Sequence, residues 1–254
     1  MKKVMIITLI AISVILLNSC GQTTGTQTTR LDELKLEYDQ IGLQHNMKLD
    51  EMLSVYGDHP EKRTMQTCRR LADDHFTGTG SIAGDVVDRI YGTRQFAKAT
   101  ASADVIDMLA DSIEIFAKYP DVFDSITVVL DCGLDIQDKI RRLESIYLLV
   151  DEHVENEDDK HSILNGLSTT IHSLEYWGEN YDEWQQTLTG TIGKRTLGIG
   201  AIIGITDGVG AVIGTLEGIR DTHKGQEGRV GIIAGRALGE AAKTSVYAFI
   251  AIVL

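Results

Sequence analysis

Glycine recurs at every fourth position along three runs near the C-terminus, and this pattern constrains the fold more than any other feature of the chain. The runs are Gly200, Gly204 and Gly208; Gly210, Gly214 and Gly218; and Gly231, Gly235 and Gly239. Residues four apart share one face of a helix, so each run forms a smooth strip that another backbone can approach closely. Because glycine costs about 1 kcal/mol relative to alanine inside a helix, we expect a close helix contact to compensate each run.

The first two runs lie in consecutive ten-residue repeats that begin at Gly198 and Gly208. A shift of ten residues turns a helix by about 1000°, which is about 80° short of three full turns. We therefore expect the two runs to face different neighbours. The polar stretch from Arg220 to Gly228 predicts a turn. Residues 189–254 are predicted to form a glycine-zipper αα-hairpin.

The N-terminal 20 residues combine two lysines, an apolar run over residues 4–17 and the tetrapeptide Leu17-Asn18-Ser19-Cys20. This order of charged, apolar and small residues is typical of a secretory signal. The tetrapeptide resembles the lipobox of bacterial lipoprotein precursors. The resemblance implies a signal peptide over residues 1–19, diacylglycerol on the sulfur of Cys20 and an acylated amine, which together anchor the chain in a membrane of the cell envelope. That membrane would be the outer one in a Gram-negative cell. The alternative is an uncleaved membrane helix.

Beyond the cysteine, residues 20–30 are rich in Gly, Thr and Gln and are predicted to form a lipidated flexible tether. Residues 31–188 carry apolar side chains at helical spacings, with few alternating runs of the kind that strands show. We expect helices over residues 31–56, 58–76, 82–91, 96–116, 121–130, 134–154 and 162–177. The predicted fold class is therefore all-α, a helical bundle followed by the hairpin.

A segment of the 31–56 helix that includes Gly42, His45 and Asn46 resembles a motif of secreted bacterial helical proteins, a resemblance that implies no activity. His45 projects from the apolar face of this helix, and we interpret it as a hydrogen-bonded core residue. A ligand or catalytic role is the alternative. A hydrolase in the bundle would need a pocket that joins His45 to Asp39 or Asp50.

Two cysteines remain once Cys20 is assigned to lipid. Cys68 and Cys132 would lie in an oxidising space, where a disulfide is stable. Two buried thiols are the alternative, because the sequence does not define the Cα separation that a disulfide requires. The pattern leaves both states open.

Charged residues interrupt the apolar tail. A 20-residue apolar stretch centred on Asp207 would be about 30 Å long as a helix, which matches a hydrocarbon core. An unpaired aspartate at mid-membrane costs about 2.5–3.5 kcal/mol. In an antiparallel hairpin Asp207 would approach Lys243 or Arg236, and Glu217 would approach Arg229. The hairpin either packs with the bundle or inserts into a bilayer, and the sequence is compatible with both.

Motifs of several enzyme and metal-site classes are missing from the sequence. There is no His-Glu-x-x-His, Gly-x-Ser-x-Gly or Walker pattern, and no histidine follows a glutamate by three positions. The acidic run over residues 151–159 lacks the spacing of a calcium loop, so we interpret it as a solvated helix junction. The net charge of −13 argues against nucleic acid as a partner.

The tail, with its three glycine runs, resembles the glycine-zipper lipoproteins of bacterial envelopes. The resemblance implies envelope association, with or without insertion into the membrane, and no catalysis. We therefore expect a non-enzymatic lipoprotein without cofactor or metal, which contacts the membrane through Cys20 and contacts the membrane or a second copy through its hairpin. The alternative is a membrane-active protein, toxin-like or bacteriocin-like, whose hairpin inserts into a bilayer.

Overall fold

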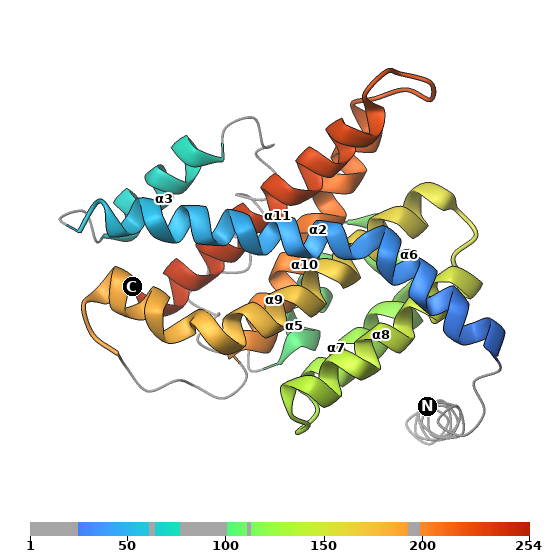
Figure 1. Ribbon diagram of the computed structural model, residues 1–254, viewed down its shortest axis with the longest axis horizontal. Coiled ribbons are helices and arrows are strands. Elements are labelled where there is room, and N and C mark those ends of the chain that lie inside the picture. Colours follow the sequence, from blue (N-terminus) through green and yellow to red (C-terminus); the bar gives the residue numbers. More distant parts are fainter. Residues whose placement is uncertain (1–24, 61–63, 77–100, 111–112, 193–198) are drawn as a thin grey trace.

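The computed structural model describes residues 25–60, 64–76, 101–110, 113–192 and 199–254. Within these ranges every regular element is a helix, which confirms the predicted all-α class (Figure 1). In chain order the helices are α2 (Gly25–Gly57), α3 (Met65–His75), α5 (Ser102–Ala110), α6 (Glu114–Lys118), α7 (Pro120–Asp131), α8 (Ile136–His153), α9 (Glu157–Thr189), α10 (Ile199–Arg220) and α11 (Arg229–Val253).

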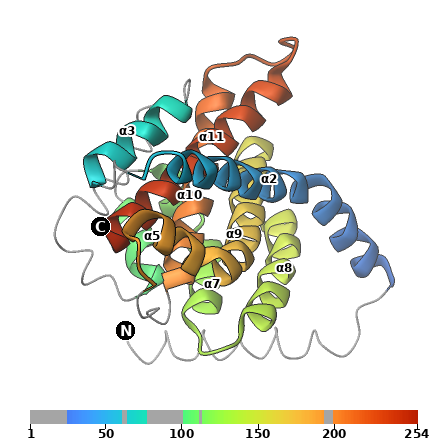
Figure 2. The ribbon, with the colours of Figure 1, turned by 60° about the vertical axis from the view of Figure 1, so that its left-hand side comes forward.

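Helix α10 lies at the centre of the molecule, between α9 and α11. It also contacts α5 and α7, while α2 crosses α9 and α11 on their outer side (Figures 1 and 2). Every residue from Ile203 to Thr215 is buried. The predicted hairpin is therefore present, but its first helix forms the core of the bundle. The predicted boundary between residues 188 and 189 separates no independent cores, because both hydrophobic clusters contain side chains from either side of it.

The turn of the hairpin lies where the polar stretch predicted it. Helix α10 ends at Arg220 and α11 begins at Arg229. Gly225 and Gly228 have φ angles of 87° and 73°, in the left-handed region that glycine adopts without a steric penalty. The tip of the hairpin projects beyond the rest of the bundle (Figure 1).

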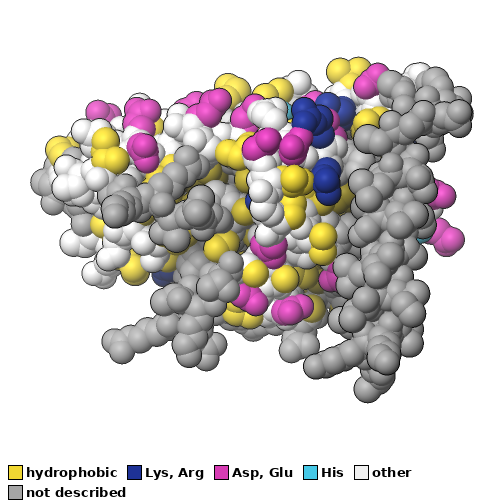
Figure 3. Space-filling model, turned by 90° about the horizontal axis from the view of Figure 1, so that it is seen from below, with side chains coloured by type: hydrophobic (Ala, Val, Ile, Leu, Met, Phe, Trp, Pro, Cys, Tyr) yellow, Lys and Arg dark blue, Asp and Glu magenta, His cyan; other side chains and the backbone are white. Residues whose placement is uncertain are grey.

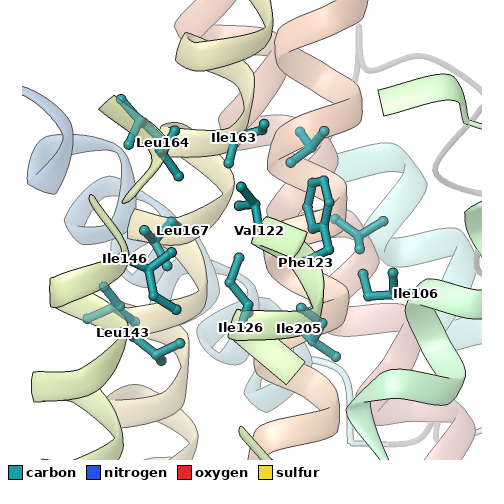
Figure 4. Close-up of a cluster of buried hydrophobic side chains, with 14 of the residues drawn as sticks. Ile106, Val122, Phe123, Ile126, Leu143, Ile146, Ile163, Leu164, Leu167 and Ile205 are labelled. Carbon is teal, nitrogen blue, oxygen red and sulfur yellow. The ribbon is translucent and has the colours of Figure 1, made fainter. Parts of the chain in front are cut away.

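Two hydrophobic clusters fill the interior. The first is mostly aliphatic, and its members from α7, α8, α9 and α10 include Ile126, Leu143, Leu167 and Ile205 (Figure 4). The second is largely aromatic and surrounds Trp177 of α9. The Trp177 ring stacks on Phe249 of α11 with centroids 4.8 Å apart, and Trp184 lies 5.2 Å away. Since both clusters draw on α9 and α10, this helix pair is the common support of the fold.

Helix α2 is longer than predicted. It begins at Gly25, so residues 25–30 are helical rather than part of a flexible tether. The Arg30 guanidinium donates two hydrogen bonds of 2.8 Å to Asp151 of α8. This bidentate contact fastens the first turns of α2 to the bundle and explains why they stay helical despite residues of low helix propensity.

Three other predicted helices have different bounds. The helix expected over residues 162–177 is α9, which extends in both directions to Glu157–Thr189. The helix expected from residue 58 begins at Met65, where the Thr64 hydroxyl caps the first turn by accepting from the Thr67 amide. The single helix expected over residues 96–116 is divided into α5 and α6, because Ile113 is extended, with φ −131° and ψ 105°. The helix expected over residues 82–91 lies outside the described residues.

The described surface carries many acidic side chains. On the face shown in Figure 3, Asp and Glu are scattered among apolar side chains, and Lys and Arg gather in one small group. Together with the net charge of −13, this distribution disfavours an anionic partner.

Candidate functional site

The first glycine run brings α10 against α9. A Cβ atom on Gly208 would lie 2.8 Å from the carbonyl oxygen of Gly166, and one on Gly204 would lie 3.5 Å from that of Thr170. Gly200 is the second residue of α10 and is partly exposed. The two helices therefore approach at backbone distance along the middle of this run, as the pattern predicted.

The second run brings α10 against α11. A Cβ atom added at Gly210, Gly214 or Gly218 would lie within 2.8 Å of a backbone atom of α11, namely the Cα of Ala241, Ala237 and Ile233 respectively. Backbone atoms cannot rotate away as a side chain can. The two runs thus face different helices, which agrees with the rotation predicted from the ten-residue repeat.

Two glycines of the third run, Gly231 and Gly235, do not form the helix contact that we predicted. Gly231 and Gly235 are exposed, and a Cβ atom on either would meet no atom within 4 Å, whereas Gly239 is buried. The face of α11 that contacts α10 contains Ile233 and Ala237. Positions two residues away lie about 200° around the helix, so Gly231 and Gly235 point away from α10.

Asp207 of α10 is the centre of a buried polar cluster that joins four helices. Its Oδ2 atom accepts hydrogen bonds from Ser173 and Trp177 of α9 and from Ser245 of α11. The distances are 3.3 Å to Trp177 Nε1 and 2.8 Å to Ser245 Oγ. His45 of α2 places Nε2 3.7 Å from the same oxygen, and both side chains are fully buried. We call these five residues the Asp207 cluster.

His45 reaches the cluster because the motif around it docks α2 onto α9. The Nδ1 atom of His45 lies 3.0 Å from the Asn46 side-chain oxygen, and the Asn46 amide donates to the backbone carbonyl of His172. One turn earlier, Gly42 leaves room for the His172 ring, which a Cβ atom there would overlap. The three motif residues therefore set the crossing of α2 over α9 and aim the imidazole at Asp207.

The two carboxylates considered as catalytic partners of His45 lie elsewhere. Asp39 Oδ1 is 3.5 Å from His172 Nε2, and Asp50 accepts a 2.8 Å hydrogen bond from the Tyr176 hydroxyl. The serines of the Asp207 cluster donate to the carboxyl and not to the imidazole. The cluster thus lacks the contact between nucleophile and base that a hydrolytic triad requires.

Burial sets the protonation of the cluster. Desolvation raises the pKa of Asp207 well above its ordinary value of 3.8, and outweighs the hydrogen bonds from the serines and Trp177, which favour the carboxylate. Desolvation also lowers the pKa of His45 to about 4. Burial therefore favours the uncharged form of both groups.

The basic side chains of α11 do not pair with Asp207, contrary to our prediction. Lys243 Nζ lies 2.7 Å from Asp73 of α3, and Arg236 lies 3.2 Å from Asp221. Both cations keep partial contact with solvent at the ends of long side chains. Moving them to the buried carboxyl would cost their hydration, which a single buried contact rarely offsets.

The second predicted pair, Glu217 with Arg229, is also replaced by other contacts. Arg229 lies 3.5 Å from Asp158 of α9. Glu217 is buried, and desolvation raises its pKa although Arg220 and Arg236 oppose the rise. The α10–α11 interface is therefore held by backbone approach at glycines and not by ion pairs.

Cys68 and Cys132 form no disulfide. Cys68 is buried in the aromatic cluster, whereas Cys132 follows the last residue of α7 and its thiol donates to the Val129 carbonyl. Both thiols are free in this structure, and Cys132 is only partly buried.

The acidic run over residues 151–159 is a helix junction whose carboxylates form salt bridges with lysine and arginine side chains. Besides its contact with Arg30, Asp151 lies 3.6 Å from Lys160, and Asp159 lies 2.6 Å from Lys118. Within the described ranges, no three His, Cys, Asp or Glu side chains converge as they would around a metal.

One helix in the described part of the chain, α10, is long and apolar enough to cross a membrane, a property that the core helix of a soluble protein shares. Of the 18 residues in its most apolar window, 89% are buried inside the structure.

Three members of the Asp207 cluster were not predicted from the sequence: Ser173, Trp177 and Ser245. The sequence does contain a pattern that relates two of them. Ser173 and Trp177 are four residues apart, so they share one face of α9. Their contact with Asp207 depends on the angle between α9 and α10, which the pattern does not give.

Comparisons with protein-family models, with curated proteins and with solved structures found no match to this chain.

Proposed function

We propose that this chain is a non-enzymatic protein of the bacterial cell envelope, anchored to a membrane through lipid on Cys20 and acting by binding. The lipobox-like tetrapeptide that ends at Cys20 carries this proposal, and the start of α2 at Gly25, five residues later, supports a close attachment. An extended chain of five residues spans at most about 18 Å. The lipid would thus hold the folded body close to the bilayer surface.

The anchor would act on a rigid body because α2 is fastened along its length. Arg30 bonds to Asp151, Lys35 bonds to Glu144 and His45 lies in the Asp207 cluster. These contacts connect α2 to α8, α9, α10 and α11. Because the tether is short and α2 is held by these contacts, the bundle would keep a fixed orientation at the membrane and would not rotate freely about its anchor.

The buried polar residues support binding over catalysis as the mode of action. His45, Ser173 and Ser245 are fully buried and are used in contacts between helices. A catalytic group must instead reach its substrate at hydrogen-bond distance. We infer that the polar groups of the core maintain the fold, and that recognition takes place at the surface.

Replacing Cys20 with alanine tests the anchor. We expect the variant to lose metabolic palmitate labelling and to accumulate as an uncleaved or soluble species, because the acylated sulfur is gone. Cys132→Ala is the matched control and should keep both the label and the membrane fraction. Undiminished labelling of the Cys20 variant would refute the lipoprotein proposal.

A second candidate is a membrane-active protein whose hairpin leaves the core and inserts into a bilayer. The observation that favours it is α10 itself, a 22-residue apolar helix in which burial raises the pKa of the central Asp207 carboxyl and so favours its neutral form. A neutral Asp207 avoids the penalty of a charged group at mid-membrane. The packed helix would then be the stored form of a membrane span.

Dye release from phosphatidylcholine vesicles tests the second candidate. The mature chain with Cys20→Ser, at micromolar concentration, should release an entrapped dye if the hairpin inserts. A variant whose α10 is cross-linked to α9 by an engineered disulfide should release dye only after reduction. Intact vesicles with the uncross-linked chain would eliminate this candidate.

A further inference from the structure

The outer side of α2 carries a line of exposed apolar side chains. Leu36, Leu43 and Met47 are 79%, 46% and 61% exposed. Their spacings of seven and four residues place them within about 20° of a single line along the helix. The buried residues of α2, such as Leu34 and His45, lie on the opposite side. We call Leu36, Leu43 and Met47 the α2 ridge.

The ridge is uncharged as well as apolar. Gln40 is the exposed residue between Leu36 and Leu43 on this face. Acidic residues border the ridge: Glu33 and Glu51 lie beyond its ends, and Asp39 lies beside it, about 60° around the helix from Leu36. Isolated exposed apolar residues are common, but three in line on a helix form a continuous strip. In a chain of net charge −13, such a strip is suited to an uncharged apolar partner and not to an anionic one.

The position of the ridge along the chain indicates the partner. Helix α2 begins five residues after Cys20, and Leu36 follows eleven residues later, about 16 Å along the helix axis. If Cys20 carries lipid, the bilayer is within about 18 Å of the start of α2. A helix tethered this closely can lie along the surface, with its outer side at the boundary between headgroups and acyl chains.

We propose that the α2 ridge lies on the bilayer that holds the acyl chains of Cys20, in contact with zwitterionic headgroups and the upper part of the chains. This inference rests on the proposed function, because it takes the lipid anchor as its starting point. The ridge turns a point attachment into a two-point attachment and thereby orients the bundle. Its opposite face stays in the core, so the contact needs no rearrangement of the described helices.

Nitroxide labels on the acylated protein in phosphatidylcholine vesicles test the proposal. A cysteine replaces Leu43 in a Cys132→Ala background. Cys68 is buried and Cys20 is blocked by its thioether, so only the new thiol reacts. The control is Val128→Cys on α7, also an exposed apolar position at 54% and away from α2 (Figures 1 and 2).

The readout is the ratio of accessibility to oxygen, which enters lipid, over accessibility to a water-soluble nickel complex. We expect vesicles to raise this ratio severalfold at residue 43 and to leave it unchanged at residue 128. Equal ratios at the two sites in a protein that carries palmitate would overturn the ridge contact while leaving the anchor intact. Absence of palmitate would instead refute the proposed function. A rise at residue 43 without vesicles that grows with protein concentration would identify a second copy of the chain as the occupant and also overturn the proposal.

A second variant measures the strength of the contact. The mature chain with Cys20→Ser lacks the anchor, so its vesicle binding reports the ridge alone. Replacing Leu36, Leu43 and Met47 together with serine should weaken flotation with phosphatidylcholine vesicles on the order of a hundredfold, since each side chain loses apolar burial. The melting temperature should fall by only a few degrees, because none of the three side chains belongs to the two hydrophobic clusters and serine costs only a few tenths of a kcal/mol of helix propensity at each site. Equal flotation of both chains would contradict the ridge.

Discussion

Replacing Gly214 with alanine should destabilise the protein by about 1–3 kcal/mol, whereas the same replacement at Gly235 should stabilise it by about 0.4–1 kcal/mol. At Gly214 the new methyl would lie 2.7 Å from the Arg236 carbonyl carbon and 2.8 Å from the Ala237 Cα. Those atoms move only if α10 and α11 separate. At Gly235 the methyl meets no atom, and alanine gains helix propensity.

The pair of variants is informative because both glycines belong to runs of the same hairpin in which glycine recurs at every fourth position. Denaturant unfolding measures both changes, and isoleucine at each site extends the comparison. We expect Gly214→Ile to be worse than Gly214→Ala and Gly235→Ile to remain close to the wild type. Similar free energies of unfolding for the two alanine variants would show that the α10–α11 interface does not rest on backbone approach at Gly214.

Replacing Asp207 with asparagine should change how stability depends on pH. The folded-state pKa of Asp207 is raised above its unfolded value of 3.8, so this group contributes stability at low pH that is lost as pH rises towards the folded pKa. The wild type should therefore lose stability relative to Asp207→Asn by up to about 1.4 kcal/mol per pH unit above pH 3.8.

His45 has the opposite dependence. Its pKa is lowered from 6.5 to about 4, so its neutral form contributes stability above pH 6.5 that is lost as pH falls through 4. The full effect is on the order of 3 kcal/mol. Relative to His45→Gln, the wild type should gain stability from pH 4 to 6.5.

Denaturant unfolding of the wild type and the two single variants across this pH range checks both trends. Comparison with the wild type removes the contribution of the surface carboxylates, which all three proteins share. If the wild type instead gains stability over Asp207→Asn as pH rises, the carboxyl is ionised in the core. Asp207 and His45 would then form a buried ion pair, and the neutral cluster would be wrong.

The elements that could be predicted are those whose signal is local. The spacing of apolar residues predicted the bounds of α2, α7 and α8 to within a few residues. The ten-residue repeat predicted that the first two glycine runs face different helices. The division between α5 and α6 was not predictable in this way, because Ile113 interrupts an apolar pattern that continues through it. Periodicity records which face is buried and not whether the backbone stays helical.

The pairing of charges was mispredicted for a different reason. Counting positions along an antiparallel hairpin placed Asp207 near residue 241, and Ser245 of the same helix is indeed its partner. The count does not include the cost of bringing Lys243 into the core, nor the presence of Asp73 on α3, which holds that lysine at the surface. His45 is 162 positions from Asp207, so only the crossing of α2 over the bundle brings them together.

The central place of α10 has a consequence for the order in which the molecule can fold. Of the helices that contact it, α5, α7 and α9 precede it in the chain, so they are synthesised before the segment that fills the space between them. Until residues 199–220 emerge, the faces of α5, α7 and α9 that contact α10 are open to solvent, and such faces favour association between chains. Closure then requires contacts between distant parts of the sequence, which slows folding. A chaperone that shields the incomplete bundle would therefore act before the hairpin appears.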